Sequence, residues 1–239
     1  MQQMGCRTMH AYLLALNEDE AARIQCKRLM TVAISRFFRD RGLWRTVEKE
    51  ILPRIIEENI DKVRVWSAGC GCGEEVYSLK ILWHNADRHF QSLPDLEIWA
   101  TDMNPVYLDK ARAGVYQRSS LKEVPGRLLT RYFVPEAKGR GYEVSELLKQ
   151  GIVWLNQNLL SDPPGTEFQV IFLRNSLLTY YEEKLKSSAF QMVLNSQAPR
   201  GFLIIGAHEK IPLAVKGLLP FGHHPCVFQK EETSSLKQQ

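Results

Sequence analysis

The 239-residue sequence contains no run of about 18 uncharged apolar residues, so it offers no candidate for a transmembrane helix. Residues 1–7 lack the apolar core of a secretory signal peptide, and we therefore expect a cytoplasmic protein without membrane insertion. A strong charge of either sign is also missing. The 31 basic and 27 acidic residues give a net charge of +4, which is too small to indicate a nucleic-acid partner.

Cysteine is scarce and poorly placed for cross-links or metal ligation. The five cysteines stand at positions 6, 26, 70, 72 and 226, which matches neither a disulfide framework nor the paired Cys/His sets of a zinc site. We therefore predict no metal site. Hydrophobic residues at 44% and charged residues at 24% are typical of a globular chain and exclude a wholly disordered one.

The hydrophobic pattern changes near residue 60. Up to that point it predicts helices: one beginning at Asn17 with a basic face of Arg23, Lys27 and Arg28, and one over 44–58 that Pro53 would kink. Beyond it, short β-rich runs alternate with helical segments. The expected strands are 63–66, 96–100, 152–155, 169–173 and 202–205, and the expected helices are 74–83, 105–113 and 182–195.

Strands that alternate with helices predict an α/β fold with a doubly wound, mainly parallel sheet covered on both faces. Residues 132–150 interrupt the alternation, and the turn at 138–141 between two β-rich runs predicts a hairpin insertion. We accordingly expect a helical N-terminal domain at 1–60, a sheet domain at 61–230 with a small β-subdomain at about 130–150, and a polar tail at 231–239.

A glycine-rich loop, residues 69–73, separates the first expected strand from a helix that begins with Glu74 and Glu75. Glycines at such a turn let the backbone approach a ligand closely. A dinucleotide site would present a helix N-terminus to phosphate, whereas two carboxylates repel phosphate and suit a cationic or hydroxyl-rich ligand. A tight turn with ordinary N-terminal acids is the alternative.

Asp102 directly follows the second expected strand. In nucleotide-binding α/β folds a carboxylate at this place accepts hydrogen bonds from both ribose hydroxyls. The alternative is a cap for the helix at 105–113, which Asn104 could provide instead. A loop that disfavours phosphate and an acid that suits ribose suggest an adenosine cofactor without phosphates, such as S-adenosylmethionine.

Seven stretches, spread in order along the chain, carry a shared pattern: residues 35–40 (SRFFRD), 65–79 (VWSAGCGCGEEVYSL), 100–104 (ATDMN), 110–116 (KARAGVY), 131–133 (RYF), 158–160 (NLL) and 172–175 (FLRN). They resemble the CheR-type methyltransferases, which transfer a methyl group from S-adenosylmethionine to glutamate side chains of bacterial chemoreceptors. The resemblance implies a class I, Rossmann-like methyltransferase sheet, with S-adenosylmethionine as cofactor and S-adenosylhomocysteine as product.

The resemblance also implies which residues contact the cofactor. These are Ser35, where the family usually has threonine, and Arg39, Gly69, Glu75, Asp102, Asn158, Leu159, Asn175 and Ser176. In this assignment Glu75 pairs with the methionine ammonium, Asp102 holds the ribose, and Asn158 and Leu159 frame the adenine. Arg39 would reach the cofactor carboxylate or an acidic substrate through a two-pronged hydrogen bond. A surface ion pair with Asp40 or Glu48 is the alternative for Arg39, and Phe37 and Phe38 are expected in the core.

The sequence departs from the family pattern at the expected catalytic position. Thr179 stands where the family has an active-site tyrosine, and Tyr180 follows it, so a one-residue bulge would be needed for Tyr180 to take that role. We therefore count Arg39, Thr179 and Tyr180 as the candidate catalytic residues. The family's Gly-His-Ser-Glu near the last strands is altered to GAHE at 206–209, and the helical region before the match is shorter than in other members.

The resulting expectation is a protein-glutamate O-methyltransferase acting on a chemoreceptor-like or other acidic protein. The basic face would meet an acidic helix, and the hairpin could dock a peptide strand. A carboxylate acceptor is already ionised near neutral pH, so the site needs no general base. The alternatives are a catalytically weak S-adenosylmethionine-binding partner module and a methyltransferase retargeted to another acceptor.

Overall fold

The computed structural model describes residues 6, 8–19, 22, 35–86, 90, 92–136, 139, 141–212 and 215–232. The chain forms two compact units, Met1–Ile34 and Ser35–Gln239. Residues 35–60, which the pattern placed in a separate helical domain, thus belong to the same unit as the sheet. In the described ranges no helix is long and apolar enough to cross a bilayer.

The first unit contains helix α1 (Met9–Glu18), whose N-terminus is capped by Thr8 Oγ1 accepting a hydrogen bond from the Ala11 amide at 3.2 Å. Asn17 therefore lies near the end of a helix and does not begin one. The capping bond expected there is made two residues later, where Asp19 Oδ1 accepts from the Ala22 amide at 3.0 Å. The predicted basic face of Arg23, Lys27 and Arg28 lies outside the described residues.

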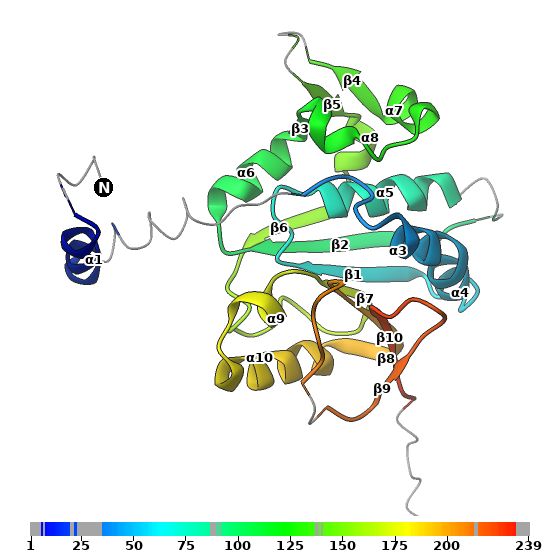
Figure 1. The fold of residues 1–239 in the computed structure, drawn as a ribbon. Coiled ribbons are helices and arrows are strands. Elements are labelled where there is room, and N and C mark those ends of the chain that lie inside the picture. The colour runs from blue at the N-terminus through cyan, green and yellow to red at the C-terminus, as the bar shows by residue number, and fades with distance from the viewer. Residues whose placement is uncertain are drawn as a thin grey trace, which may run out of the picture. The chain divides into compact units, whose positions relative to one another are not determined.

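The second unit is built on a seven-stranded sheet with the order β6-β2-β1-β7-β8-β10-β9 (Figure 1). The strands are β1 (Lys62–Ala68), β2 (Asp95–Asp102), β6 (Ile152–Asn156), β7 (Phe168–Leu173), β8 (Gln197–Ile205), β9 (Leu218–Pro220) and β10 (Val227–Lys230). The first five named are parallel, which confirms the predicted fold class. Strands β9 and β10 were not among the predicted strands. At one edge of the sheet β10 pairs antiparallel with β8, and β9 pairs antiparallel with β10.

Both faces of the sheet are buried, because the central strands β1, β7 and β8 contribute residues to two different hydrophobic clusters. In β1, Val63 and Val65 pack into one cluster, whereas Trp66 and Ala68 pack into the other. Helices α5 (Glu74–Ala86), α3 (Arg41–Thr46) and α4 (Leu52–Ile56) cover the first face, and α9 (Leu177–Tyr180) and α10 (Glu183–Asn195) the second (Figure 1). This two-sided burial explains why the strands are almost continuously apolar in sequence.

Helices α3 and α4 are joined without a break by a π-helical turn, Val47–Ile51. In this turn the Leu52 amide donates to the Val47 carbonyl, five residues earlier. Pro53, which lacks an amide hydrogen, follows directly and lies in the first turn of α4. A widened turn thus precedes the proline in the helical run predicted over 44–58.

A second, three-stranded antiparallel sheet has the order β3-β5-β4. The hairpin expected within 132–150 is present as β4 (Phe133–Pro135) and β5 (Tyr142–Val144), and β3 (Val115–Tyr116) adds a strand too short to be recognised in sequence. Two further helical segments belong to this subdomain, the 3₁₀ turn η3 (Arg118–Leu121) and α7 (Gly126–Tyr132), and α6 (Pro105–Ala113) and α8 (Glu146–Lys149) flank it.

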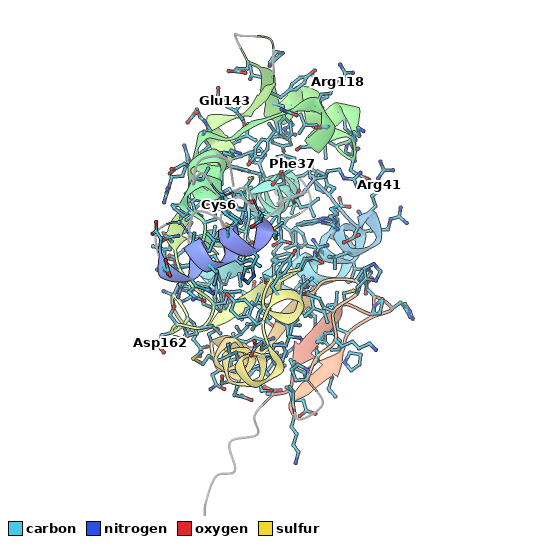
Figure 2. The ribbon with its side chains drawn as sticks, turned by 60° about the vertical axis from the view of Figure 1, so that its left-hand side comes forward. Cys6, Phe37, Arg41, Arg118, Glu143 and Asp162 are labelled. Carbon is cyan, nitrogen blue, oxygen red and sulfur yellow. The ribbon has the colours of Figure 1, made fainter. Side chains whose placement is uncertain are left out.

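Residues 35–40 are anchored between this small sheet and α5. The Phe37 ring packs edge-on against Tyr116 at 4.8 Å and Phe133 at 5.1 Å between ring centroids, and the Phe38 amide donates to Ser78 Oγ at 3.0 Å. Both phenylalanines are buried, as expected from sequence. Figure 2 shows Phe37 in the interior, while the labelled Arg41 lies at the surface.

Candidate cofactor site

The carboxyl ends of β1 and β7 form the point at which the sheet changes direction. The chain runs from β1 outward through β2 to β6 and then returns to the other side of β1 as β7. In open α/β sheets ligands bind in the crevice outside the strands at such a switch point. Of the site residues expected from sequence, Gly69, Asn175 and Ser176 lie in the loops that leave these strands, and Glu75 lies in the first turn of the helix after β1.

The glycine-rich loop follows β1 and folds back on the end of β2. The amides of Gly69 and Cys70 both donate to the Thr101 carbonyl, at 2.8 and 2.9 Å. Gly69 has a φ of +86°, and a Cβ there would lie 2.7 Å from the Cβ of Ser176. Glycine is thus required at this position both for backbone conformation and for space.

Asp102 at the end of β2 holds this loop in place. Its Oδ2 accepts from the Gly71 amide at 2.9 Å and its Oδ1 from the Asn104 amide at 2.8 Å. Burial raises the pKa of Asp102, an effect that these two backbone donors oppose. Asn104 caps α6 through the Val106 amide at 3.1 Å, so the cap that was an alternative role for Asp102 is supplied by its neighbour.

Glu75 has a partner that sequence reasoning did not identify. Its Oε2 accepts from Arg174 Nη1 at 3.1 Å, and its Oε1 accepts from the Ser67 hydroxyl at 2.8 Å. The second terminal nitrogen of Arg174 pairs with the Asp40 carboxylate. The Arg174 side chain is only 6% exposed, so a buried cation joins α5 to the turn that precedes α3. Arg174 belongs to the FLRN stretch but is not among the site residues that the family resemblance implies.

Asn175 and Ser176 form the turn after β7, and Thr179 lies in the short helix α9 that follows it. Asn175 has a φ of +50°, which is uncommon for a residue other than glycine. The Ser176 hydroxyl donates to the Ala68 carbonyl at 3.0 Å, which ties this turn to the end of β1. Thr179 is exposed, and its hydroxyl donates to Glu209 Oε1 at 2.6 Å. Glu209, in the altered GAHE segment, is a further residue that sequence reasoning did not assign to the site.

Asn158 and Leu159 follow β6 at the neighbouring strand end. Asn158 Oδ1 accepts from the Leu160 amide at 3.0 Å and from the Tyr181 hydroxyl at 3.1 Å, and Leu159 is buried. Burial and the nearby charge of Asp102 raise the pKa of Tyr181. Tyr180, in contrast, is 75% exposed. The phenol close to Asn158 and Asp102 is therefore that of Tyr181, two positions beyond Thr179.

Ser35 and Arg39 are among the first residues of the unit that contains the sheet. Ser35 is half-buried, and Arg39 is exposed with its amide donating to the Arg36 carbonyl at 3.3 Å. Asp40, one of the two ion-pair partners considered for Arg39, is bound to Arg174. The Asp40–Arg174 pair brings Asp40, the residue after Arg39, to the start of the turn of Asn175 and Ser176.

These residues fit S-adenosylmethionine better than a phosphate-bearing nucleotide. Each oxygen of Asp102 accepts one backbone hydrogen bond and keeps a lone pair for a ribose hydroxyl. At the start of α5, Glu74 is buried and Glu75 is paired with Arg174, so this helix N-terminus carries two acids where a phosphate would have to approach. Among the described residues, no group of three or more His, Cys, Asp or Glu side chains is placed to hold a metal ion.

The comparisons with known proteins agree with this fit. The family model described as CheR methyltransferase, SAM binding domain, matches residues 33–224. The chain is similar to the chemotaxis protein methyltransferases of Listeria innocua, at 35% identity, and Listeria monocytogenes, at 33%, over 206 residues that make up 85% of this chain and 75% of each relative. It is also 31% identical to an uncharacterized 104.1 kDa protein of Rhodobacter capsulatus, over 88% of this chain and 22% of that protein's length.

Proposed function

The chain belongs to the CheR methyltransferase family, whose cofactor is S-adenosylmethionine, and we propose that it methylates glutamate side chains of a chemoreceptor-like protein. The observation that carries the proposal is the juxtaposition of Asp102, the 69–73 loop and the Arg174–Glu75 pair at the switch point of the sheet. The names of the Listeria relatives support the chemotaxis assignment.

In the proposed reaction the bound cofactor supplies a methyl group that its sulfonium has already activated. The protein's part is then to position donor and acceptor and to exclude water. Asp102 accepts hydrogen bonds from the ribose hydroxyls, and Asn158 and Leu159 frame the adenine. Glu75 faces the cofactor ammonium while it remains bound to Arg174. A glutamate acceptor is ionised near neutral pH, so no side chain has to remove a proton.

The proposed acceptor is a segment of an acidic protein. The exposed strand β4 lies at an edge of the β3-β5-β4 sheet, and an extended peptide of the partner can add to such an edge through main-chain hydrogen bonds. Arg39, near the turn after β7, would hold an acidic side chain. We place the protein in the cytoplasm, where the signalling domains of receptors lie, without a role for nucleic acid or membrane insertion.

The test is incubation of the chain with radiolabelled S-adenosylmethionine and receptor cytoplasmic domains, followed by measurement of base-labile methyl esters. We expect label in the receptor fraction, lost on mild alkaline treatment and abolished by Asp102→Ala at low cofactor concentration. Binding of S-adenosylhomocysteine without any base-labile label on receptor domains would refute the glutamate assignment and leave the cofactor assignment in place.

Thr179 favours a second candidate, a slow enzyme that acts mainly as a cofactor-binding partner module. A threonine is several ångströms shorter than the family tyrosine, and its hydroxyl is already bound to Glu209. Loss of a group that orients the acceptor costs roughly 100-fold in rate. At saturating cofactor, Thr179→Tyr should then raise turnover, and Tyr180→Phe should leave it unchanged because Tyr180 is exposed. Equal rates for Thr179→Tyr and the unaltered chain would remove this position from the chemistry.

A further inference from the structure

Glu209 collects hydrogen bonds from two segments that lie more than 25 residues apart in the chain. Its Oε2 accepts from the Gly206 amide at 2.7 Å and from the Asn175 amide at 2.9 Å. Its Oε1 accepts from the Thr179 hydroxyl at 2.6 Å. One carboxylate thus joins the loop after β8 to the turn after β7 and to the helix α9 that follows it.

The turn after β7 has a backbone conformation that gains from support by other segments. Asn175 adopts a left-handed backbone conformation with φ +50°, and α9, which follows, is only four residues long. Asparagine tolerates this conformation better than most residues, and hydrogen bonds from neighbouring segments help to hold it there. The bonds to Glu209 supply that support. Space is also matched, because a Cβ at Gly206 would lie 2.7 Å from both Asn175 Oδ1 and Glu209 Oε2.

The turn held by Glu209 carries three groups of the cofactor site. Arg174 pairs with Glu75, Asn175 is an expected cofactor contact, and Ser176 bonds to the Ala68 carbonyl. Ser176 also lies directly behind Gly69, where no side chain fits. A shift of this turn would therefore move the start of the glycine-rich loop, which is the part of the site that meets the cofactor.

We propose that Glu209 is a positioning residue of the cofactor site and that Thr179 is its hydroxyl partner, not a group that meets the methyl acceptor. The hydroxyl of Thr179 donates its only proton to Glu209, which leaves it no donor for an acceptor carboxylate. The inference rests on one part of the proposed function, which is that the chain binds S-adenosylmethionine. It is independent of which protein is methylated.

The experiment compares two substitutions at Thr179, one that removes the hydroxyl and one that removes the methyl group. Thr179→Val keeps the shape and removes the hydroxyl, whereas Thr179→Ser keeps the hydroxyl. We expect calorimetry to show S-adenosylhomocysteine affinity reduced about threefold to tenfold in Thr179→Val and within twofold of the unaltered chain in Thr179→Ser. Thr130→Val is the matched control, because that exposed hydroxyl donates to the Gly126 carbonyl at 3.1 Å on α7, in a different part of the fold.

Glu209→Gln and the double variant Thr179→Val/Glu209→Gln test whether the two residues act through one bond. We expect Glu209→Gln to weaken binding more than Thr179→Val, and the double variant to be no weaker than Glu209→Gln alone. The Km for S-adenosylmethionine should rise in step with the dissociation constant, with turnover at saturating cofactor little changed. A structural role alone would lower the unfolding temperature of all variants without this pattern.

Equal affinities of Thr179→Val and Thr179→Ser would overturn the inference, as would independent, multiplicative effects in the double variant. If Glu209→Gln fails to fold, the valine and serine pair still decides the point, since both alter only an exposed side chain. An unaltered chain that binds S-adenosylhomocysteine but forms no methyl ester would refute the proposed acceptor and leave this inference to be judged on the binding data. A chain that binds no S-adenosylhomocysteine would overturn both.

Discussion

Substitution of Arg174 by methionine should destabilise the protein by about 2–3 kcal/mol. The variant fills much of the same volume but removes the cation that joins Glu75 to Asp40. The Arg174 side chain is 6% exposed, and the Glu75 side chain is 15% exposed. Glu75 would keep the Ser67 hydroxyl as a donor but would lose its compensating charge.

The magnitude follows from the exposure of each partner. Removal of one member of a fully buried ion pair costs about 3–5 kcal/mol, because the charge left behind has neither water nor a partner. Asp40 is 39% exposed and can be hydrated, so most of the cost arises at Glu75 alone. For a chain of this length, 2–3 kcal/mol corresponds to a fall of roughly 4–12 °C in the unfolding temperature.

Thermal unfolding and urea unfolding of cofactor-free protein measure this effect without reference to catalysis. Arg200→Met is the matched control, since Arg200 lies 3.9 Å from Glu58 with both side chains partly exposed, and we expect less than about 1 kcal/mol there. The double variant Glu75→Gln/Arg174→Met should recover part of the loss because a neutral amide replaces the uncompensated carboxylate. A loss in Arg174→Met no larger than in Arg200→Met would refute the reasoning.

Three further outcomes are expected. Asp102→Ala should weaken binding of S-adenosylhomocysteine by about 1.5–3 kcal/mol in calorimetry, and unchanged affinity would remove Asp102 from the ribose site. Gly69→Ala should lower the free energy of unfolding by more than about 1 kcal/mol, because φ is +86° and the new Cβ would meet Ser176. Gly126→Ala is the control: no atom lies within 4 Å of the new Cβ, so this variant should be neutral or slightly stabilising. Equal effects of the two substitutions on the free energy of unfolding would contradict the steric argument. Burial raises the pKa of Cys72 from its ordinary 9.0 to about 11. At pH 8 the thiolate is then about 100-fold scarcer but roughly tenfold more nucleophilic, so iodoacetamide should label Cys72 about tenfold more slowly than a thiol of ordinary pKa. Peptide mass mapping measures this rate, and labelling as fast as that of an ordinary thiol would contradict this environment.

Local sequence patterns were sufficient to predict the layered α/β fold and the position of the cofactor loop. Apolar runs such as those containing Val65 and Ile171 are buried on both faces, and this two-sided burial is visible as an unbroken hydrophobic stretch. The roles of the glycines at 69–73 and of Asp102 could also be predicted, because they depend on local features: the backbone conformation of the loop and the end of a strand. The sequence could likewise suggest Asn104 in place of Asp102 as the cap of α6, since capping is a contact between residues close together in the chain.

The side chains that complete the site could be identified only from the folded chain. Arg174 is 99 residues from Glu75 and 134 from Asp40, and Glu209 is 30 residues from Thr179. No local pattern encodes such pairs, because they depend on the order of strands in the sheet and on where each loop turns back. The same holds for Tyr180 and Tyr181: they are chemically identical in the sequence, and the one that approaches Asn158 is selected by the conformation of a turn that Glu209 holds from another part of the chain.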